Sequence, residues 1–175
     1  MHVIRLTATA LVALTALAAP STASANGVRF ACDTPNGRIS ELTLPVNATR
    51  FVISGTIKPV LFRSDEQWLP TATISLQNPE TGNLLSINAI AQSGDAANAM
   101  VSVRSISGED DRTSNVGALA LNSVIGFAII YQAEGDSRII IGEQNFTATS
   151  QLTTNFNLTF NCSTADFVFE NISWR

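Results

Sequence analysis

The sequence has a single histidine, His2, and a single lysine, Lys58, in 175 residues. His2 lies in an N-terminal segment that we expect to be removed, so the mature chain would contain no histidine. Such a chain cannot form a Ser-His-Asp triad, a Cys-His pair or a histidine metal site. A Ser-Lys mechanism would depend on Lys58 alone. Carboxylate chemistry and a calcium site are the options that remain.

Residues 1–25 have the features of a secretory signal peptide. Arg5 gives a weakly positive start, an apolar stretch follows, and Ala23 and Ala25 are the small residues that a signal peptidase reads. The apolar stretch is too short for a membrane span, and no later stretch is long enough. We expect residues 26–175 to form one secreted or periplasmic domain, of bacterial origin because the signal is compact and alanine-rich. An uncleaved anchor is the alternative.

The sequence is also short of positive charge. It has 10 Lys and Arg against 14 Asp and Glu, and removal of Arg5 leaves nine against 14, a mature net charge of about −5. No block of basic residues occurs. A mildly acidic chain of this kind does not favour nucleic acid or an anionic membrane surface as a partner.

Only two cysteines are present, Cys32 and Cys162. An even number in an oxidising compartment predicts a disulfide between them. This bond would close almost the whole mature chain into one loop and, since it ties the two ends of the chain, would place the first and last strands side by side. Two free buried thiols are the alternative.

The apolar residues recur with a period of two, which predicts strands rather than helices. In residues 152–160 the apolar side chains, Phe156 among them, alternate with Asn and Thr, so one face is a core face and the other is solvated. About 150 mature residues are enough for one full core. The expected strands are 50–57, 71–77, 84–90, 99–104, 124–131, 137–142, 152–160 and 166–174.

Three parts of this pattern resemble the concanavalin A-like lectin/glucanase jelly roll, including laminin-G-like modules. They are residues 52–57, residues 127–131 followed by 138–142, and the final run 167–174. The resemblance implies an all-β, single-domain antiparallel β-sandwich of jelly-roll type with adjacent N- and C-terminal strands. The Glu-x-Asp-x-x-Glu strand of the glucanases and the histidine of the legume-lectin metal site are missing here, so the resemblance does not carry over an enzymatic activity.

A first candidate site is the segment 64–70. Trp68 follows Asp65, Glu66 and Gln67 in a stretch that ends in proline. A flat indole can stack on a sugar ring while carboxylate and amide oxygens accept hydrogen bonds from its hydroxyls. These four residues are the predicted ligand-binding residues. The alternative is a loop in which Trp68 covers the edge of the core.

A second candidate site is the acidic run Glu109, Asp110 and Asp111 beside Gly108. Three carboxylates in a loop could bind Ca²⁺ together with backbone carbonyls, and no other cofactor is expected. The alternative is a solvated loop tip.

Five Asn-x-Ser/Thr sequences are glycan acceptors in a eukaryotic secreted protein but only polar strand faces in a bacterial one, and we favour the second interpretation. They begin at Asn47, Asn145, Asn157, Asn161 and Asn171.

The sequence favours a secreted, non-catalytic binding module for carbohydrate or another surface polymer. A structural or adhesive protein of the cell envelope is the second hypothesis, because polar strand faces suit it. A glycan hydrolase or lyase that uses only carboxylates is the third. The sequence predicts no ligand identity and no oligomeric state.

Overall fold

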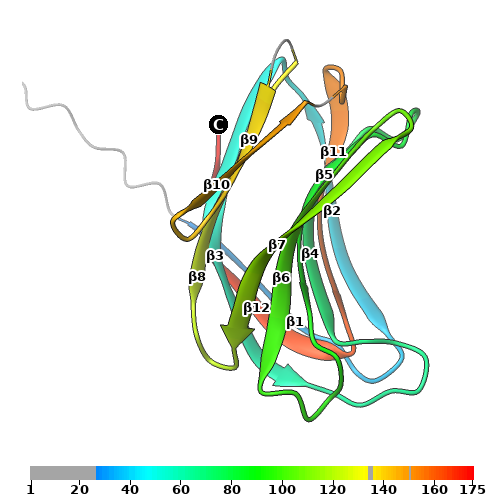
Figure 1. The fold of residues 1–175 in the computed structure, drawn as a ribbon, viewed down its shortest axis with the longest axis vertical. Helices are drawn as coiled ribbons and strands as arrows, with labels where there is room; N and C mark the ends of the chain where they lie inside the picture. The colour runs from blue at the N-terminus through cyan, green and yellow to red at the C-terminus, as the bar shows by residue number, and fades with distance from the viewer. Residues whose placement is uncertain (1–26, 134–135, 150) are drawn as a thin grey trace, which may run out of the picture.

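A computed structural model describes residues 27–133, 136–149 and 151–175. The predicted signal peptide lies outside these residues and stays a prediction. All regular secondary structure in the described part is β-strand, in two antiparallel sheets of six strands each (Figure 1). The expected antiparallel β-sandwich is confirmed. No helix in the described residues is long and apolar enough to cross a membrane.

We name the two sheets A and B and give their strands in spatial order. Sheet A consists of β1 (Val28–Asp33), β12 (Ala165–Trp174), β3 (Arg50–Phe62), β8 (Ile125–Gln132), β9 (Asp136–Ile141) and β10 (Gln144–Thr149). Sheet B consists of β2 (Ile39–Asn47), β11 (Asn155–Ser163), β4 (Thr71–Gln77), β5 (Leu84–Ile90), β6 (Asn98–Ser107) and β7 (Asp110–Ala120).

The core lies between the sheets, and the alternation in each strand explains why. In β11, Phe156, Leu158 and Phe160 are buried, whereas Asn157 and Thr159 between them are partly exposed. The predicted core face and solvated face are therefore confirmed within β11, whereas residues 152–154 precede the strand and Thr154 is exposed. The Phe156 ring packs edge-on against Tyr131 of sheet A, with ring centroids 5.0 Å apart. Such aromatic pairs hold the two layers in contact.

The two ends of the chain pair in sheet A, as expected. In β1 and β12, Phe30 lies opposite Phe169 and Cys32 lies opposite Phe167. The predicted disulfide is present, but Cys162 belongs to β11 of sheet B, and the Cα atoms of the two cysteines are 6.2 Å apart. The bond therefore joins the two sheets, and the terminal strands are adjacent through their own hydrogen bonds.

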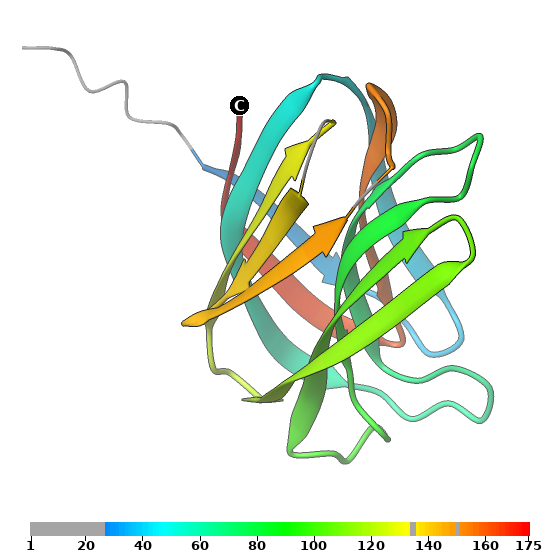
Figure 2. The ribbon, with the colours of Figure 1, turned by 45° about the horizontal axis from the view of Figure 1, so that its top comes forward.

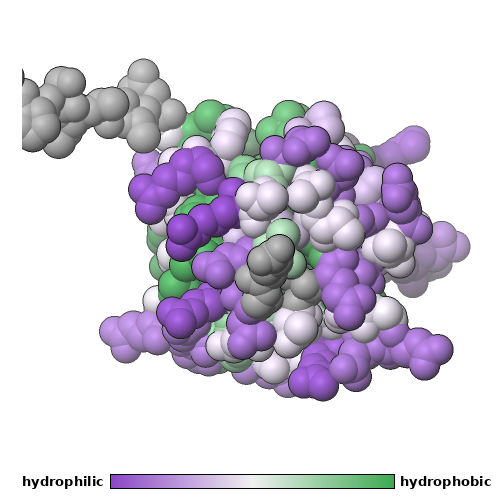
Figure 3. Space-filling view, turned by 90° about the horizontal axis from the view of Figure 1, so that it is seen from above, coloured by the Kyte–Doolittle hydropathy of each residue, from purple (hydrophilic) through white to green (hydrophobic). Residues whose placement is uncertain are grey.

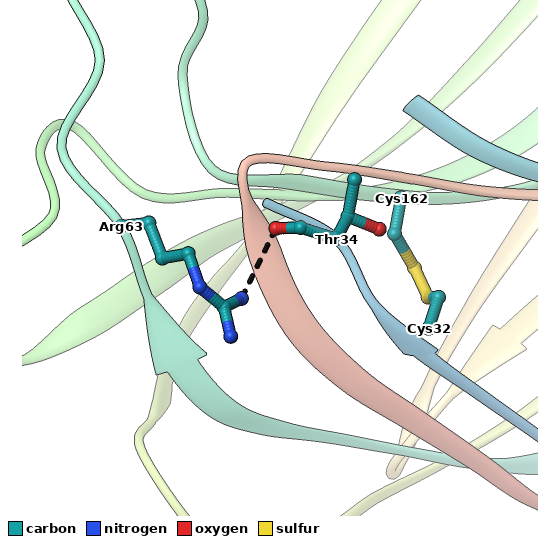
Figure 4. The surroundings of a disulfide bond; sticks show 4 residues. All are labelled: Cys32, Thr34, Arg63 and Cys162. Atoms are coloured by element: carbon teal, nitrogen blue, oxygen red, sulfur yellow. Dashed lines mark hydrogen bonds between the residues drawn. A yellow bond between two sulfur atoms is a disulfide. The ribbon is translucent and has the colours of Figure 1, made fainter. Parts of the chain in front are cut away.

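Figure 4 shows the disulfide beside the end of β1, where Arg63 donates a hydrogen bond to the carbonyl oxygen of Thr34 at 3.1 Å. We call this end of the sandwich, which also carries residues 63–70, the disulfide end. The opposite end carries the β4–β5 and β6–β7 turns, and we call it the turn end (Figure 1). Figure 3 looks down on the turn end, which is mostly hydrophilic or of intermediate hydropathy.

Both sheets bend in the same direction. In Figure 1 the ends of sheet B turn away from sheet A, so the outer face of sheet B is concave and the outer face of sheet A is convex. At one edge of the sandwich, β10 runs obliquely toward β6 and β7 (Figure 2). These two features, the concave face and the β6–β7/β10 edge, determine where a ligand can reach the protein.

Candidate functional site

The predicted ligand-binding residues of the first candidate site lie in one exposed loop at the disulfide end. Asp65 Oδ1 accepts hydrogen bonds from the backbone N–H groups of Gln67 at 2.9 Å and Trp68 at 3.0 Å. The Asp65 carboxylate therefore shapes its own loop. The indole of Trp68 is about half exposed, with a relative accessibility of 46%. Glu66 is exposed beside it, and the binding role of this loop stays a prediction.

The three acidic residues of the second candidate site do not converge. Glu109 is in the β6–β7 turn, while Asp110 and Asp111 begin β7 and point to opposite faces of it. Asp110 accepts a hydrogen bond from Arg112 at 3.1 Å, and Asp111 is bound by Arg104. No group of three His, Cys, Asp or Glu side chains in the described residues could hold a metal ion. Calcium binding there stays a prediction without a shared coordination site.

The two candidate sites lie at opposite ends of the sandwich. The 63–70 loop connects β3 to β4 at the disulfide end, and the 108–109 turn connects β6 to β7 at the turn end (Figure 1). A short oligosaccharide therefore cannot contact both segments at once. They are therefore two separate hypotheses.

The concave outer face of sheet B joins polar residues from all six strands, and we call it the polar face. Strand register aligns its short polar side chains in rows that cross the sheet. One row is Glu41, Asn161, Thr73, Asn88, Ser102 and Asn115, and the next is Thr43, Thr159, Ser75, Ser86, Arg104 and Thr113.

The centre of the polar face is lined by serines that are nearly covered. Ser75 of β4 and Ser86 of β5 are neighbours across the sheet, and their relative accessibilities are 7% and 1% although they point away from the core. Only side chains of the polar face itself can cover them. This burial is the expected consequence of a concave sheet with larger side chains around small ones.

Side chains on the polar face are partly paired with one another. Thr73 donates to the Asn88 Oδ1 atom at 3.1 Å, and the Asn88 amide donates to Ser86 at 3.2 Å. By contrast, the side chains of Asn161, Ser102 and Asn115 have no hydrogen-bond partner within the described part of the chain. The face therefore combines oriented polar groups with free donors and acceptors.

The polar face has almost no free charge. Its outward-facing charged side chains in the strands of sheet B are Glu41, Arg104 and Asp111. Arg104 donates from Nε to Asp111 Oδ1 at 2.9 Å and from Nη2 to Oδ2 at 2.6 Å. The hydrogen bond from Arg104 lowers the pKa of Asp111, so the pair stays ionised at neutral pH. The only cation on this face is therefore neutralised.

Solved structures place this architecture among known folds. The chain is similar to the alginate lyase from Alteromonas sp. 272, with 11% identity, a TM-score of 0.61 and 77% of each chain covered. It has the jelly-roll fold of the concanavalin A-like proteins. The carbohydrate recognition domain of Emp46p in its metal-free form has 11% identity and a TM-score of 0.59, with 83% of this chain and 81% of that chain covered.

The carbohydrate-binding module CBM66 from Bacillus subtilis has 14% identity and a TM-score of 0.52, with 86% of this chain and 92% of that chain covered. No protein-family model and no curated protein matches the chain. At these identities the comparisons show the fold alone. Carbohydrate-binding proteins and polysaccharide lyases occur among the similar structures, so the fold is compatible with either role.

Sequence reasoning identified part of the polar face. The alternation in 152–160 showed that Asn157, Thr159 and Asn161 share a solvated face. The continuation of these rows into β4, β5 and β6 depends on strand register, which one sequence does not reveal. The burial of Ser86 depends on sheet curvature and could not be predicted either.

Proposed function

We propose that the mature protein is a secreted, non-catalytic carbohydrate-binding module that holds an uncharged polysaccharide on its polar face. The observation that carries the proposal is a pair of adjacent rows, made mainly of Ser, Thr and Asn side chains, that cross the concave sheet face. The jelly-roll fold, shared with carbohydrate-binding proteins, supports it.

The residue types on the polar face suit sugar hydroxyls. A sugar hydroxyl both donates and accepts hydrogen bonds, and Asn amides and Ser or Thr hydroxyls do the same. Neighbouring strands are about 4.8 Å apart, so each row offers such groups at regular intervals. No outward-facing aromatic residue occurs in the strands of sheet B. Recognition would therefore depend on hydrogen bonds rather than on ring stacking.

The charge on the polar face favours an uncharged polymer. A polyanion needs free cationic side chains, and Arg104 is already bound by Asp111 through two hydrogen bonds. Glu41 adds a negative charge to the same face. A polymer of uronic acids would meet repulsion here, whereas a neutral polysaccharide would not.

The titratable groups support a non-catalytic role. General acid–base catalysis works best with a group whose pKa lies near the working pH. On the polar face the pKa of Asp111 is lowered, away from neutrality, by Arg104. Tyr131 is buried in the core, where its hydroxyl donates to the carbonyl oxygen of Thr153. The similarity to alginate lyases is a similarity of fold, so we treat depolymerisation as an outcome of the test.

The disulfide and the predicted signal peptide together support a location outside the cytoplasm. A buried disulfide fits a protein that matures in an oxidising compartment. We propose the bacterial periplasm or the extracellular space, where the partner would be a glycan or another polymer of the cell envelope.

The test measures retention of the mature protein on cellulose, xylan, mannan, starch and alginate. We expect retention on at least one uncharged polysaccharide and none on alginate. Asn88→Leu and Ser102→Leu, which change the polar face, should abolish retention. Ser54→Leu, the same type of change on the outer face of sheet A, should leave it intact. Failure to bind any uncharged polymer, or equal retention of Ser102→Leu, would reject the proposal.

The same experiment separates the remaining hypotheses. Loss of retention in Trp68→Ala alone would move the site to the 63–70 loop, and loss in EDTA would make calcium bound near Glu109, Asp110 and Asp111 necessary. New reducing ends or unsaturated products would contradict the non-catalytic role.

A further inference from the structure

A second concave feature lies at the edge of the sandwich, where β6 and β7 of sheet B face β9 and β10 of sheet A. A cleft with a volume of about 690 Å³ opens there, and we call it the edge cleft. Figure 2 shows β10 running obliquely toward β6 and β7 at this edge. The residues that matter for the argument are Ser105, Ser107, Asp110, Arg112, Ser114 and Phe146.

The wall from sheet B is polar where a core face should be apolar. The inward positions of β6 begin with buried Ala99, Val101 and Val103 and continue with Ser105 and Ser107. Ser105 lies opposite Arg112 of β7. A sandwich core needs apolar residues at such positions. The change to polar side chains coincides with a change from buried to partly exposed positions, so Ser105 and Ser107 line the cleft rather than the core.

The hydroxyl groups of this wall are free. Within the described residues, the side chains of Ser105, Ser107 and Ser114 have no hydrogen-bond partner. Arg112 contacts Asp110 at 3.1 Å, but both side chains are largely exposed, so this pair is weak. Arg112 can turn toward a ligand at little cost.

The opposite wall carries apolar side chains beside the polar residues Asn145, Thr147 and Thr149. Phe146 of β10 lies opposite Ile139 of β9, and Ala148 follows on the same face of β10. Phe146 is half-buried, so part of its ring is available. Hydroxyl groups facing an aromatic ring across a cleft match a sugar, which has a C–H face and hydroxyl edges.

Hydrogen bonds hold both ends of the cleft. At one end the Gln144 amide donates to the carbonyl oxygen of Val116 at 2.8 Å and so joins β10 to β7. At the other end, Asn83 donates to the Gln151 carbonyl oxygen and accepts from the Gly108 N–H, each at 2.9 Å. Asn83 is 4% exposed. The width of the cleft is therefore fixed before a ligand arrives, which lowers the entropic cost of binding.

We propose that the edge cleft is a saccharide site, separate from the polar face, that takes a short uncharged oligosaccharide or the end of a glycan chain. Its volume lies within the roughly 300–1,000 Å³ of small-molecule sites. The lining residues include two carboxylates, Asp110 and Asp136, and two guanidinium groups, Arg104 and Arg112. Because Arg104 is bound by Asp111, the cleft has no excess of positive charge to attract an acidic sugar. The inference does not depend on binding at the polar face.

The test titrates the ¹⁵N-labelled mature protein with cellotriose, xylotriose, mannotriose, maltotriose and trigalacturonate. At least one uncharged trisaccharide should shift the amide resonances of Ser105, Ser107 and Phe146, and trigalacturonate should not. Ser105→Leu fills the cleft and should weaken this binding by about tenfold or more. Ser54→Leu is the matched control, because it makes the same change on the outer face of sheet A, away from both proposed sites.

A second variant guards against a folding defect. Arg112→Ala changes an exposed side chain, so it should keep the melting temperature and still weaken trisaccharide binding. If no trisaccharide shifts the cleft resonances, or if Ser105→Leu and Arg112→Ala both bind as the wild type does, the edge cleft is no saccharide site. Loss of trisaccharide binding in these variants with unchanged polysaccharide retention would separate this site from the polar face.

Discussion

Arg104 of β6 and Asp111 of β7 form a bidentate ion pair on the polar face, with donor–acceptor distances of 2.9 and 2.6 Å. Arg104 is the only cation among the outward-facing strand residues of the polar face, and this pair makes it unavailable to a ligand. Asp110, the neighbour of Asp111, points to the other side of β7 and pairs with Arg112. Asp111 therefore pairs with a cation on the outer face of sheet B, and Asp110 pairs with a cation on its inner face.

Release of Arg104 should change which polymer binds. We expect Asp111→Asn to give the polar face affinity for alginate, and added salt should abolish this affinity because the interaction is between opposite charges. Asp110→Asn is the control, since it leaves the polar face unchanged. The measurement is retention on alginate at low and high ionic strength. Equal behaviour of the two variants would show that Arg104 does not determine the preference for uncharged polymers.

The faces of β11 predict a large difference between two adjacent residues. Phe156 is 2% exposed and packs against Tyr131 and Phe51. Phe156→Ala should lower the free energy of unfolding by about 3–5 kcal/mol because it leaves a cavity. Asn157→Ala, on the opposite face, should change it by less than about 0.5 kcal/mol. Urea unfolding measures both values. A loss below about 1 kcal/mol in Phe156→Ala would contradict the packing of the core.

The sequence predicted the bounds of the central strands but not those of the edge strands. The eight expected strands correspond to β3, β4, β5, β6, β8, β9, β11 and β12, each of which has a neighbour on both sides. No bounds could be given for β1, β2, β7 and β10, which are the four edge strands. A central strand alternates clearly because one of its faces is in the core. Edge strands are less buried, so β2 tolerates Pro45 and β7 begins with the charged residues Asp110, Asp111 and Arg112.

The disulfide was predicted from the cysteine count, but its place between the sheets was not. Residues 162 and 166 are close in sequence, so Cys162 was assigned to the final stretch. A single residue, Thr164 with a φ of 52°, separates β11 from β12, and the two strands belong to different sheets. The edge cleft was not predicted at all, since its residues come from both sheets. The polar inward positions Ser105 and Ser107 were the available signal.

The Cys32–Cys162 bond should contribute strongly to stability. It closes a loop with a sequence separation of 130 residues, for which loop entropy gives about 4–5 kcal/mol as an upper value. The variant Cys32→Ser/Cys162→Ser should unfold at a lower urea concentration than the wild type. Reduction of the wild type by dithiothreitol is the control and should give a similar loss. Identical urea midpoints with and without the disulfide would show that the bond does not stabilise the folded protein.

Asp166 should make stability depend on pH. Burial and the nearby Asp33 raise its pKa, although Arg63 and Arg29 act in the opposite direction. A carboxyl with a higher pKa in the folded state binds its proton more tightly there. Ionised Asp166 therefore destabilises the protein above its folded pKa, and this penalty vanishes as the pH falls below its unfolded pKa.

Asp166→Asn should consequently raise the melting temperature at neutral pH and leave it unchanged in acid. Asp95→Asn is the opposite case, because the hydrogen bond from Ser93 lowers the pKa of Asp95. That variant should lose stability at neutral pH and none below the folded pKa of Asp95. Thermal melts across this pH range measure both effects. A lower melting temperature for Asp166→Asn at neutral pH would mean that the attraction to Arg63 and Arg29 outweighs burial.

The polar face is the central claim, and an amide-shift map tests it most directly. The ¹⁵N-labelled mature protein is titrated with a soluble fragment of the uncharged polysaccharide that retains it. We predict shifts at Thr73, Asn88, Ser102 and Thr159, which lie in adjacent rows of the polar face. Shifts confined to residues 63–70 or to the outer face of sheet A would contradict the account.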